Sequence, residues 1–250
     1  MDLAEKVCLV TGGTSGIGAA TALEFAKRGA HVAIVARTSN EPAMEALRRA
    51  ASERGRRAIF IGADAGRGED CRWAVSEACS ELGHVDVLVH AAGGAAPGGL
   101  MEITEERWRA AFDVHVHAVL SLAQAVAPSM KKRGGGAIIL IGSAAGQRGC
   151  LGAIAYGVVK GALPQFARTL ARELGDDNIR VNCVSPGVIR TPFQNHLTPA
   201  QVENNVRNRI PLHREGKPED VARIIAELVE NEFITGQDVV IDGGMTMRIV

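Results

Sequence analysis

Short apolar runs alternate along the chain with longer segments whose apolar residues recur at helical spacing. A short run that is apolar throughout is typical of a strand covered on both faces, whereas helical spacing predicts an amphipathic helix. The alternation predicts an α/β fold, a doubly wound parallel sheet of seven strands with helices on both faces. The runs cover residues 7–10, 31–35, 58–61, 85–89, 137–141, 179–184 and 238–241, and the periodic segments cover 19–28, 41–54, 69–82, 105–132, 153–174 and 218–230.

No break in composition divides the chain, so a single domain over residues 1–250 is expected. Residues 192–211 fall outside the strand and helix patterns. This segment is polar and rich in asparagine, and it lies between the sixth strand and the last helix. We interpret it as a small lid over a substrate site.

The turn between the first strand and the first helix is rich in glycine and reads Thr11-Gly12-Gly13-Thr14-Ser15-Gly16-Ile17-Gly18. Glycine allows a tight turn and a close approach of the backbone to a ligand, and the N-terminus of the following helix attracts phosphates. Between a strand and a helix this motif predicts a dinucleotide site. The alternative is a glycine-rich turn that binds no ligand. The predicted contacts are Gly12, Thr14, Ser15, Gly16, Ile17 and Gly18.

Residues that follow the strands lie where an open α/β sheet binds its ligands. Arg37 follows the second strand, where an acidic residue would hold a ribose hydroxyl; its guanidinium suits a phosphate instead and favours NADP over NAD. The alternative is an exposed surface arginine. Asp64 follows the third strand and is a candidate acceptor for the adenine amino group. Its alternative role is a helix N-cap.

Ser143 closes the fifth strand, and Tyr156 and Lys160 follow at a spacing of four residues on one helix face. An ammonium beside a phenol favours the phenolate and is expected to lower the tyrosine pKa, which suits acid–base chemistry. Ser143 is then placed to hydrogen-bond a carbonyl or alcohol. The alternative is an unrelated tyrosine and lysine on one helix face.

Composition excludes several classes of function. Lys and Arg total 28 and Asp and Glu total 28, so the net charge gives no indication of nucleic-acid binding. No apolar run is expected to reach the roughly 20 residues of a membrane helix. The N-terminus has no signal-peptide pattern, and the five cysteines form no C-x-x-C pair, which predicts reduced thiols in a cytoplasmic protein. His115 and His117 point to different sides of a helix, so no metal site is expected.

Together these motifs identify the chain as similar to the short-chain dehydrogenases/reductases over nearly its whole length, and to bacterial 3-oxoacyl-(acyl-carrier-protein) reductases among them. The matching motifs are Thr11-Gly12-x-x-x-Gly16-Ile17-Gly18, Asp64, Ala92-Gly93, Ser143, Tyr156-x-x-x-Lys160, Pro186-Gly187-x-x-x-Thr191, Ile234-Thr235-Gly236-Gln237 and Asp242-Gly243-Gly244. The resemblance implies a Rossmann-like fold, an NAD(P) cofactor and a small carbonyl or alcohol substrate. It also implies a homotetramer whose interface includes the long helices that contain Trp108 and Tyr156.

The resemblance assigns roles to individual residues. Tyr156 is implied as the proton donor or acceptor, Ser143 as the group that orients the substrate, and Lys160 as the pKa modulator and ribose ligand. The implied cofactor contacts further along the chain are Ala91, Ala92, Gly93, Tyr156, Lys160, Pro186, Gly187, Ile189 and Thr191, and the last four flank the nicotinamide.

Three positions depart from the family pattern. The usual Asn-Asn-Ala-Gly reads His90-Ala91-Ala92-Gly93, where the backbone still supplies the cofactor contacts. The catalytic asparagine of the long helix aligns with His115, which donates and accepts hydrogen bonds but is larger and has an ordinary pKa near neutrality. Pro164 lies inside the helix of Tyr156, where it removes one backbone hydrogen bond and is expected to kink the helix at a cost of about 3 kcal/mol if unrelieved.

These observations favour NADPH-dependent reduction of a ketone to a secondary alcohol, or the reverse reaction, with NAD as a possible cofactor. Two alternatives remain open. One is a 3-oxoacyl-thioester reductase that takes its substrate from acyl-carrier protein, which Arg133 and Arg172 would contact, although both are also explained as solvated helix charges. The other is a non-catalytic NADP-binding scaffold, suggested by the missing asparagine.

Overall fold

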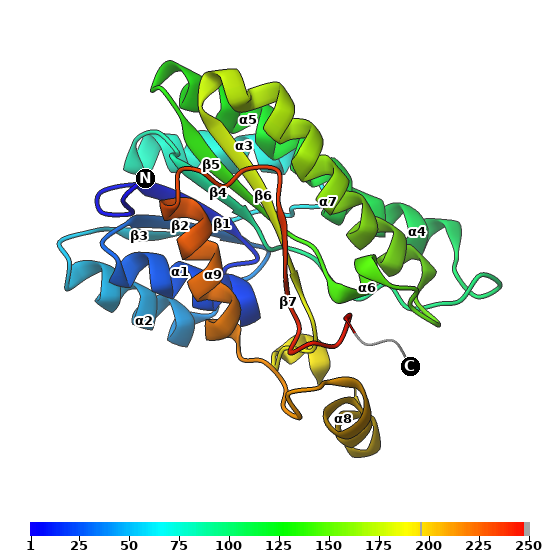
Figure 1. The fold of residues 1–250 in the computed structure, drawn as a ribbon. Coiled ribbons are helices and arrows are strands. Elements are labelled where there is room, and N and C mark those ends of the chain that lie inside the picture. Colours follow the sequence, from blue (N-terminus) through cyan, green and yellow to red (C-terminus); the bar gives the residue numbers. More distant parts are fainter. Residues whose placement is uncertain (196, 248–250) are drawn as a thin grey trace.

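A computed structural model describes residues 1–195 and 197–247. Its centre is a parallel sheet of seven strands in the order β3-β2-β1-β4-β5-β6-β7 (Figure 1). The order reverses between β1 and β4, and this confirms the predicted doubly wound, Rossmann-like sheet. The strands are β1 (Val7–Thr11), β2 (His31–Ala36), β3 (Ala58–Gly62), β4 (Val87–His90), β5 (Gly136–Ile141), β6 (Ile179–Pro186) and β7 (Asp238–Ile241).

Helices cover both faces of the sheet, because each face carries its own apolar cluster. One layer consists of α1 (Gly16–Lys27), α2 (Glu41–Ser52) and α9 (Pro218–Glu230); the other consists of α3 (Gly68–Leu82), α5 (Ala118–Lys132) and α7 (Ile154–Leu174). The helix α4 (Glu105–Phe112) extends α5 and packs on α7. The strand residues between the layers are almost all buried, as the apolar runs predicted.

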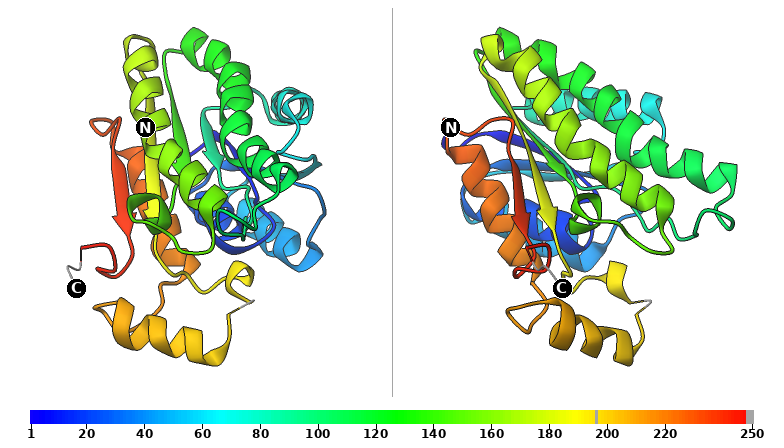
Figure 2. Two further views of the ribbon diagram at one scale, coloured as in Figure 1. Left: turned by 90° about the vertical axis from the view of Figure 1, so that its right-hand side faces the viewer. Right: turned by 45° about the vertical axis from the view of Figure 1, so that its right-hand side comes forward.

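The segment predicted as a lid forms η3 (Pro192–Gln194), α8 (Pro199–Asn204) and the π-helical turn η4 (Asn205–Arg209), and residue 196 lies outside the described residues. In both views of Figure 2, α8 lies apart from the two helix layers, beyond the end toward which β6 and β7 point. This places the segment at the carboxyl edge of the sheet, where the candidate site residues also lie.

The predicted helix over 105–132 is continuous, but its middle turn is the π-helix η1 (Asp113–His117), which the sequence pattern did not indicate. The helix α7 also runs without interruption through Pro164, so the expected kink does not break it. Pro164 has no N–H to donate to the carbonyl oxygen of Lys160. That oxygen lies against Gly146 of α6 (Ala144–Gln147), and a Cβ added to Gly146 would come 2.7 Å from it. The short helix therefore packs closely on the backbone that Pro164 leaves unbonded.

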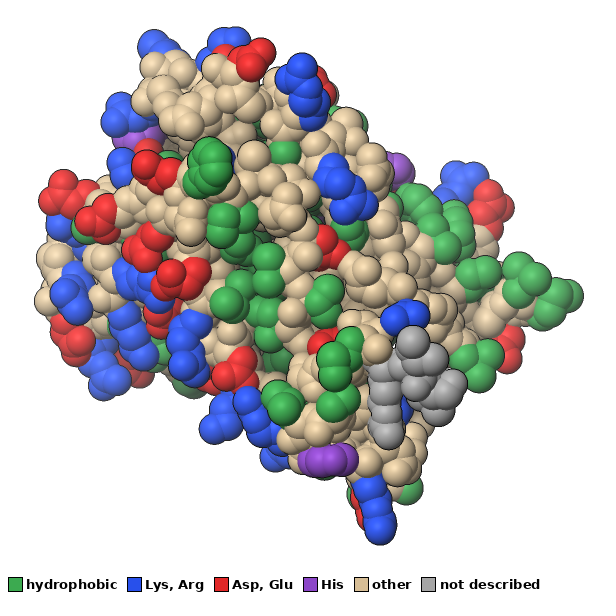
Figure 3. Space-filling view, in the orientation of Figure 1, with side chains coloured by type: hydrophobic (Ala, Val, Ile, Leu, Met, Phe, Trp, Pro, Cys, Tyr) green, Lys and Arg blue, Asp and Glu red, His purple; other side chains and the backbone are tan. Residues whose placement is uncertain are grey.

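Large apolar side chains are exposed at several places on the described residues, among them the β7 edge and the helix over 105–132. Figure 3 shows charged side chains over the α1–α2 side and a band of hydrophobic side chains over the β7 edge, where Phe233 and Val240 are exposed. Within Glu105–Lys132, an 18-residue window has a mean hydropathy of 1.3 and is 39% buried, so this helix is long and apolar enough to cross a membrane by length and composition alone, a test that core helices also pass. It contains no uninterrupted apolar run of 20 residues, because Asp113, His115 and His117 interrupt it, and its apolar residues supply both the face packed on α3 and exposed positions such as Leu120.

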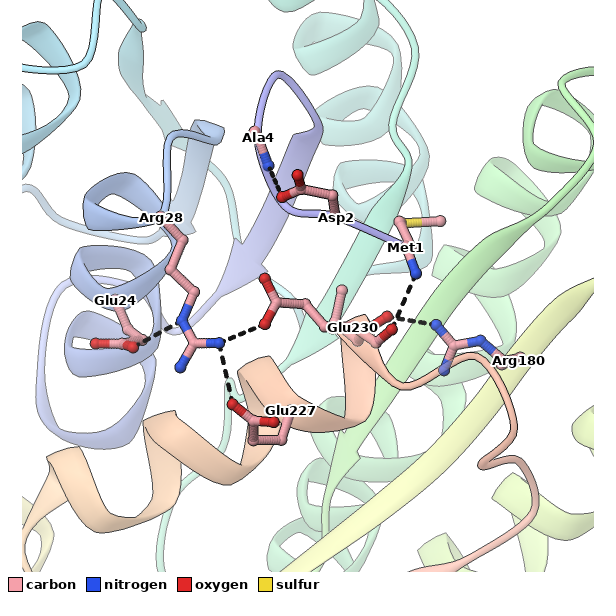
Figure 4. Close-up of polar contacts among 9 residues, drawn as sticks. Met1, Asp2, Ala4, Glu24, Arg28, Arg180, Glu227 and Glu230 are labelled. Carbon is pink, nitrogen blue, oxygen red and sulfur yellow. Dashed lines mark hydrogen bonds and ion pairs between the residues drawn. The ribbon is translucent and has the colours of Figure 1, made fainter.

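Polar contacts hold α9 to the N-terminal part of the chain (Figure 4). Arg28 at the end of α1 bonds Glu24, Glu227 and Glu230 at 2.9, 3.2 and 2.5 Å. Arg180 in β6 donates to the carbonyl oxygens of Leu228 and Val229 at the end of α9. Arg180 thereby satisfies carbonyls that the C-terminus of α9 leaves without an intrahelical partner.

Candidate active site

A single cleft of about 1540 Å³ opens at the carboxyl ends of the strands. It lies at the reversal of strand order, where Thr11 of β1 pairs with His90 of β4. Every predicted site residue lines it: Gly12, Thr14, Ser15, Gly16, Ile17, Gly18, Arg37, Asp64, Ala91, Ala92, Gly93, His115, Ser143, Tyr156, Lys160, Pro186, Gly187, Ile189 and Thr191. The fold therefore brings together residues from eight separate segments of the chain.

The glycines of the first turn are required by the packing of the protein itself. A Cβ on Gly12, whose φ is +68°, would lie 2.8 Å from the oxygen of Ala91, and a Cβ on Gly18 would lie 2.3 Å from the oxygen of Gly12. The start of α1 has no side-chain cap and no acidic residue in its first turn. Its first N–H groups therefore face the cleft without a protein acceptor, which fits the phosphates of a dinucleotide.

Arg37 and Asp64, which the sequence predicts to bind the adenosine half of such a cofactor, follow β2 and β3 and line the cleft. Arg37 is exposed at the rim and makes no hydrogen bond or ion pair with the described residues. Asp64 accepts the N–H of Gly66 at 2.9 Å through Oδ1. The alternative of Asp64 as a helix N-cap is wrong, because Arg67 occupies the cap position of α3 and Asp64 belongs to the preceding loop.

Ser143, Tyr156 and Lys160 converge where β5 ends beside α7. Ser143 is the N-cap of α6, and its Oγ accepts the N–H of Ala145 at 3.1 Å, which leaves its hydroxyl proton to be donated. Lys160 is buried, and its Nζ donates to the carbonyl oxygen of Ile141 at 2.7 Å. The same Nζ lies 5.8 Å from the centre of the Tyr156 ring. A phenol, a hydroxyl donor and an ammonium therefore share one wall of the cleft.

The pKa of Tyr156 differs from the lowered value that its spacing to Lys160 predicted. Burial raises the pKa of Tyr156, and the hydrogen bond from Ser143 acts in the opposite direction. Burial also lowers the pKa of Lys160 to about 8. The expected lowering of the Tyr156 pKa by Lys160 is not found, because desolvation of the phenol prevails and the ammonium is engaged by the Ile141 carbonyl. A neutral Tyr156 can act as a proton donor.

His90, one of the departures from the family pattern, links three elements. Its Nδ1 bonds Thr11 Oγ1 at 2.9 Å, and its Nε2 bonds the Val114 carbonyl at 2.9 Å. Thr11 Oγ1 in turn accepts the N–H of Ala92 at 3.1 Å. The Val114 carbonyl requires a ring that donates through Nε2. Burial lowers the pKa of His90 to about 4, so the ring is neutral near pH 7 and its Nδ1 accepts the Thr11 hydroxyl. The residue thus fixes the loop after β4 against β1 and η1.

His115, the second departure, is buried in the π-helical turn with its ring edge on Tyr156, 6.0 Å between centroids. Its Nε2 contacts the backbone of Gly94, and its Nδ1 is buried without a protein partner. A Cβ on Gly93 would lie 2.1 Å from the imidazole, so this ring requires glycine there. Burial lowers the pKa of His115 to about 2, which corrects the concern that it charges near neutral pH. No three potential metal ligands gather in the described parts of the chain.

Neutral burial of His90 and His115 predicts acid-sensitive stability. Both rings stay uncharged in the folded protein below the ordinary histidine pKa, whereas the unfolded chain takes up two protons near pH 6.5. The free energy of unfolding should therefore fall as the pH drops from 6.5 toward 4, by about 2.7 kcal/mol per pH unit from these two groups. Urea unfolding at several pH values measures this slope. His115→Asn should lower it by about half, and an unchanged slope would contradict neutral burial.

Comparison with known proteins places these features in a family. The sequence profile described as "Enoyl-(Acyl carrier protein) reductase" matches residues 12–246. Dehydrogenase/reductase SDR family member 4 of Oryctolagus cuniculus is 38% identical over 253 residues, which cover 99% of this chain and 96% of the relative. The 3-oxoacyl-(acyl-carrier-protein) reductase of Thermotoga maritima is 37% identical over 249 residues, which cover 99% of this chain and 100% of the relative.

Solved structures agree with the sequence relatives. L-sorbose reductase from Gluconobacter frateurii, complexed with NADPH and L-sorbose, superimposes with a TM-score of 0.90 at 32% identity, and each chain covers 100% of the other. A blue fluorescent protein from a metagenomic library, in complex with NADPH, gives a TM-score of 0.89 at 34% identity over 98% of this chain and 99% of that one.

Proposed function

Because the chain belongs to the short-chain dehydrogenase/reductase family of oxidoreductases, we propose that it reduces a ketone to a secondary alcohol with NADPH, or runs the reverse reaction. The observation that carries this proposal is the convergence of Ser143, Tyr156 and Lys160 on the cleft that begins at the glycine turn. A hydroxyl donor, a neutral phenol and a buried ammonium are the groups that a carbonyl reduction needs to orient the oxygen and protonate it.

Bound NADPH would supply hydride to the carbonyl carbon. The Ser143 hydroxyl donates a hydrogen bond to the carbonyl oxygen and keeps its proton. Tyr156 donates a second hydrogen bond to the same oxygen and transfers its proton there as negative charge develops. Lys160, fixed by the Ile141 carbonyl, stabilises the phenolate that remains. Because these groups are buried or half-buried, their charges act in a medium of low dielectric and are stronger than in water.

We assign His115 a place in the route by which Tyr156 regains its proton. Its Nδ1 is buried and has no hydrogen-bond partner within the described residues. The charge of Lys160 lies close enough to help lower the pKa of His115. A neutral imidazole of pKa about 2 takes part by accepting or donating a hydrogen bond to a relay water rather than by taking up a proton. The residue thus supports the same step as the asparagine that it replaces in the family pattern.

The cofactor preference rests on Arg37. Its exposed guanidinium forms no ion pair within the described residues and directly follows β2, where the adenosine ribose of a bound cofactor would lie, so it suits the 2′-phosphate of NADPH. Arg37→Ala should weaken NADPH binding about tenfold or more and change NADH binding little. Fluorescence titration with both cofactors measures this. Equal losses for NADPH and NADH would show that Arg37 does not read the phosphate.

We propose a homotetramer. The exposed apolar positions Leu120 and Val158 lie on α5 and α7, the long helices named for the interface, and Phe233 and Val240 lie near the β7 edge. Two separate apolar surfaces on one chain suit an assembly with two kinds of isologous contact, which closes at four copies. Light scattering of the purified protein gives the number of copies.

A 3-oxoacyl-thioester substrate is a second candidate, which the relative from Thermotoga maritima favours. Arg133 and Arg172 are exposed at the ends of α5 and α7 and form no ion pair within the described residues, so they are available to an acidic carrier protein. This role predicts reduction of acetoacetyl-(acyl-carrier protein) that weakens when both arginine charges are reversed. The remaining candidate, a non-catalytic NADP-binding scaffold, predicts cofactor binding without turnover.

A further inference from the structure

The cleft is positively charged although the whole chain is neutral. Six cationic side chains line it, namely Arg37, Arg67, Arg107, Arg148, Lys160 and Arg209, against the two carboxylates Asp64 and Asp113. Both carboxylates are already engaged, Asp64 by the N–H of Gly66 and Asp113 by His117 at 2.9 Å. Of the cations, Arg67 pairs with Glu69 and Asp70, and the other five form no ion pair within the described residues. We propose that the substrate is a carbonyl compound with an anionic group, which Arg148 and Arg209 bind; this rests on the proposed reductase function.

Arg209 is held in position by a buried amide. It lies on the π-helical turn η4, and its Nη1 donates to Asn205 Oδ1 at 2.8 Å. Asn205 is 5% exposed and also lines the cleft. Because Asn205 and Arg209 both line the cleft, this hydrogen bond holds the guanidinium at the cleft wall and leaves its other N–H donors available to a ligand. No carboxylate in the described residues pairs with Arg209.

Arg148 lines the cleft from a different element, directly after α6, the helix that Ser143 caps. Its Nε donates to the carbonyl oxygen of Thr246 at 3.0 Å, and Nη2 contacts the same oxygen. A guanidinium that bonds only a neutral carbonyl keeps its full charge. Like Arg209, it forms no ion pair within the described part of the chain.

The two arginines therefore flank the substrate end of the cleft and have no acidic partner there. A guanidinium fork matches the paired oxygens of a carboxylate or a phosphate and is less strongly hydrated than a lysine ammonium. An anionic group at a distance from the reacting carbonyl would be bound on this side, which leaves the carbonyl oxygen to Ser143 and Tyr156. Such remote binding orients a small substrate for hydride transfer.

Two matched pairs of substrates test whether an anionic group favours binding, and whether that group is a carboxylate or a phosphate. Acetoacetate and methyl acetoacetate differ by a carboxylate, and acetoacetyl-coenzyme A and the N-acetylcysteamine thioester of acetoacetate differ by phosphates. In the original protein, kcat/KM for the charged member is expected to exceed that for the uncharged member by about tenfold or more in at least one pair. In Arg209→Gln and in Arg148→Gln this ratio is expected to fall about tenfold. Arg207→Gln is the matched control, because Arg207 lies on the same turn, contacts Glu203 and does not line the cleft.

Calorimetry in the Tyr156→Phe variant with NADPH gives the same comparison as binding constants, without need of turnover. Reduction of an uncharged member tests the reductase function separately, so the two ideas fail independently. Uncharged members that bind and react as well as charged ones in both pairs would overturn the proposal. It would also be overturned if the arginine variants kept the ratio of Arg207→Gln.

Discussion

Replacing Tyr156 by phenylalanine is expected to reduce kcat by roughly 10²–10⁴-fold, the contribution of a positioned general acid, while the NADPH dissociation constant stays within about threefold because the ring remains. The structure makes this substitution clean. The phenylalanine ring keeps the edge contact with His115 and the packing against Phe193, and only the hydroxyl that meets Ser143 is lost. Steady-state kinetics and cofactor titration on the same preparation separate the two effects.

Thermal unfolding of Tyr156→Phe is the control for intact folding. Because Tyr156 is half-buried and its hydroxyl meets Ser143 at the cleft wall, the variant should unfold within a few degrees of the original protein. A variant that kept more than about a tenth of kcat would remove Tyr156 from the role of acid, since even a weak general acid contributes more than that.

The second large effect is expected for Gly18→Ala. The added methyl group would lie 2.3 Å from the carbonyl oxygen of Gly12, a backbone atom that cannot move aside as a flexible side chain would. The turn must open, which should destabilise the fold by about 1–3 kcal/mol and weaken NADPH binding on the order of 100-fold, because the N–H groups of α1 lose their placement. Urea unfolding and cofactor titration measure these two losses.

Gly149→Ala provides the comparison for that substitution. Gly149 also lines the cleft, but an added Cβ meets no atom within 4 Å, and its φ is not in the left-handed region. This variant should fold and bind NADPH like the original protein. If Gly18→Ala behaved in the same way, the close packing of the glycine turn would not be what builds the phosphate site.

The fold could be predicted from sequence because its signals are local. Each apolar run and each helical period is set by residues near one another, and the structure places all seven strands close to the predicted ranges. The π-helical turns were not predictable in this way. In η1 (Asp113–His117), β-branched and imidazole side chains of poor helix propensity interrupt the helical pattern. This was the only local indication of a π-helical turn there.

The site was predictable to the extent that its chemistry follows from strand ends and helix spacing. Ser143, Tyr156 and Lys160 line one cleft as the spacing indicated. Their pKa values were not predictable, because burial depends on contacts with distant parts of the chain, and burial gives Tyr156 a raised pKa and His115 one of about 2. The role of His90 also depends on such contacts, since Thr11 and Val114 are far from it in sequence.

The central claim is that this cleft transfers hydride from NADPH to a carbonyl group. The most direct measurement titrates the purified protein with NADPH and with NADH by fluorescence and then adds a panel of ketones, keto acids and acetoacetyl thioesters to the same samples. We expect tighter binding of NADPH than of NADH and oxidation of NADPH by at least one panel member, with that oxidation lost in Tyr156→Phe. Tight NADPH binding without oxidation by any member, in both the original protein and His115→Asn, would contradict the reductase and favour a cofactor-binding scaffold.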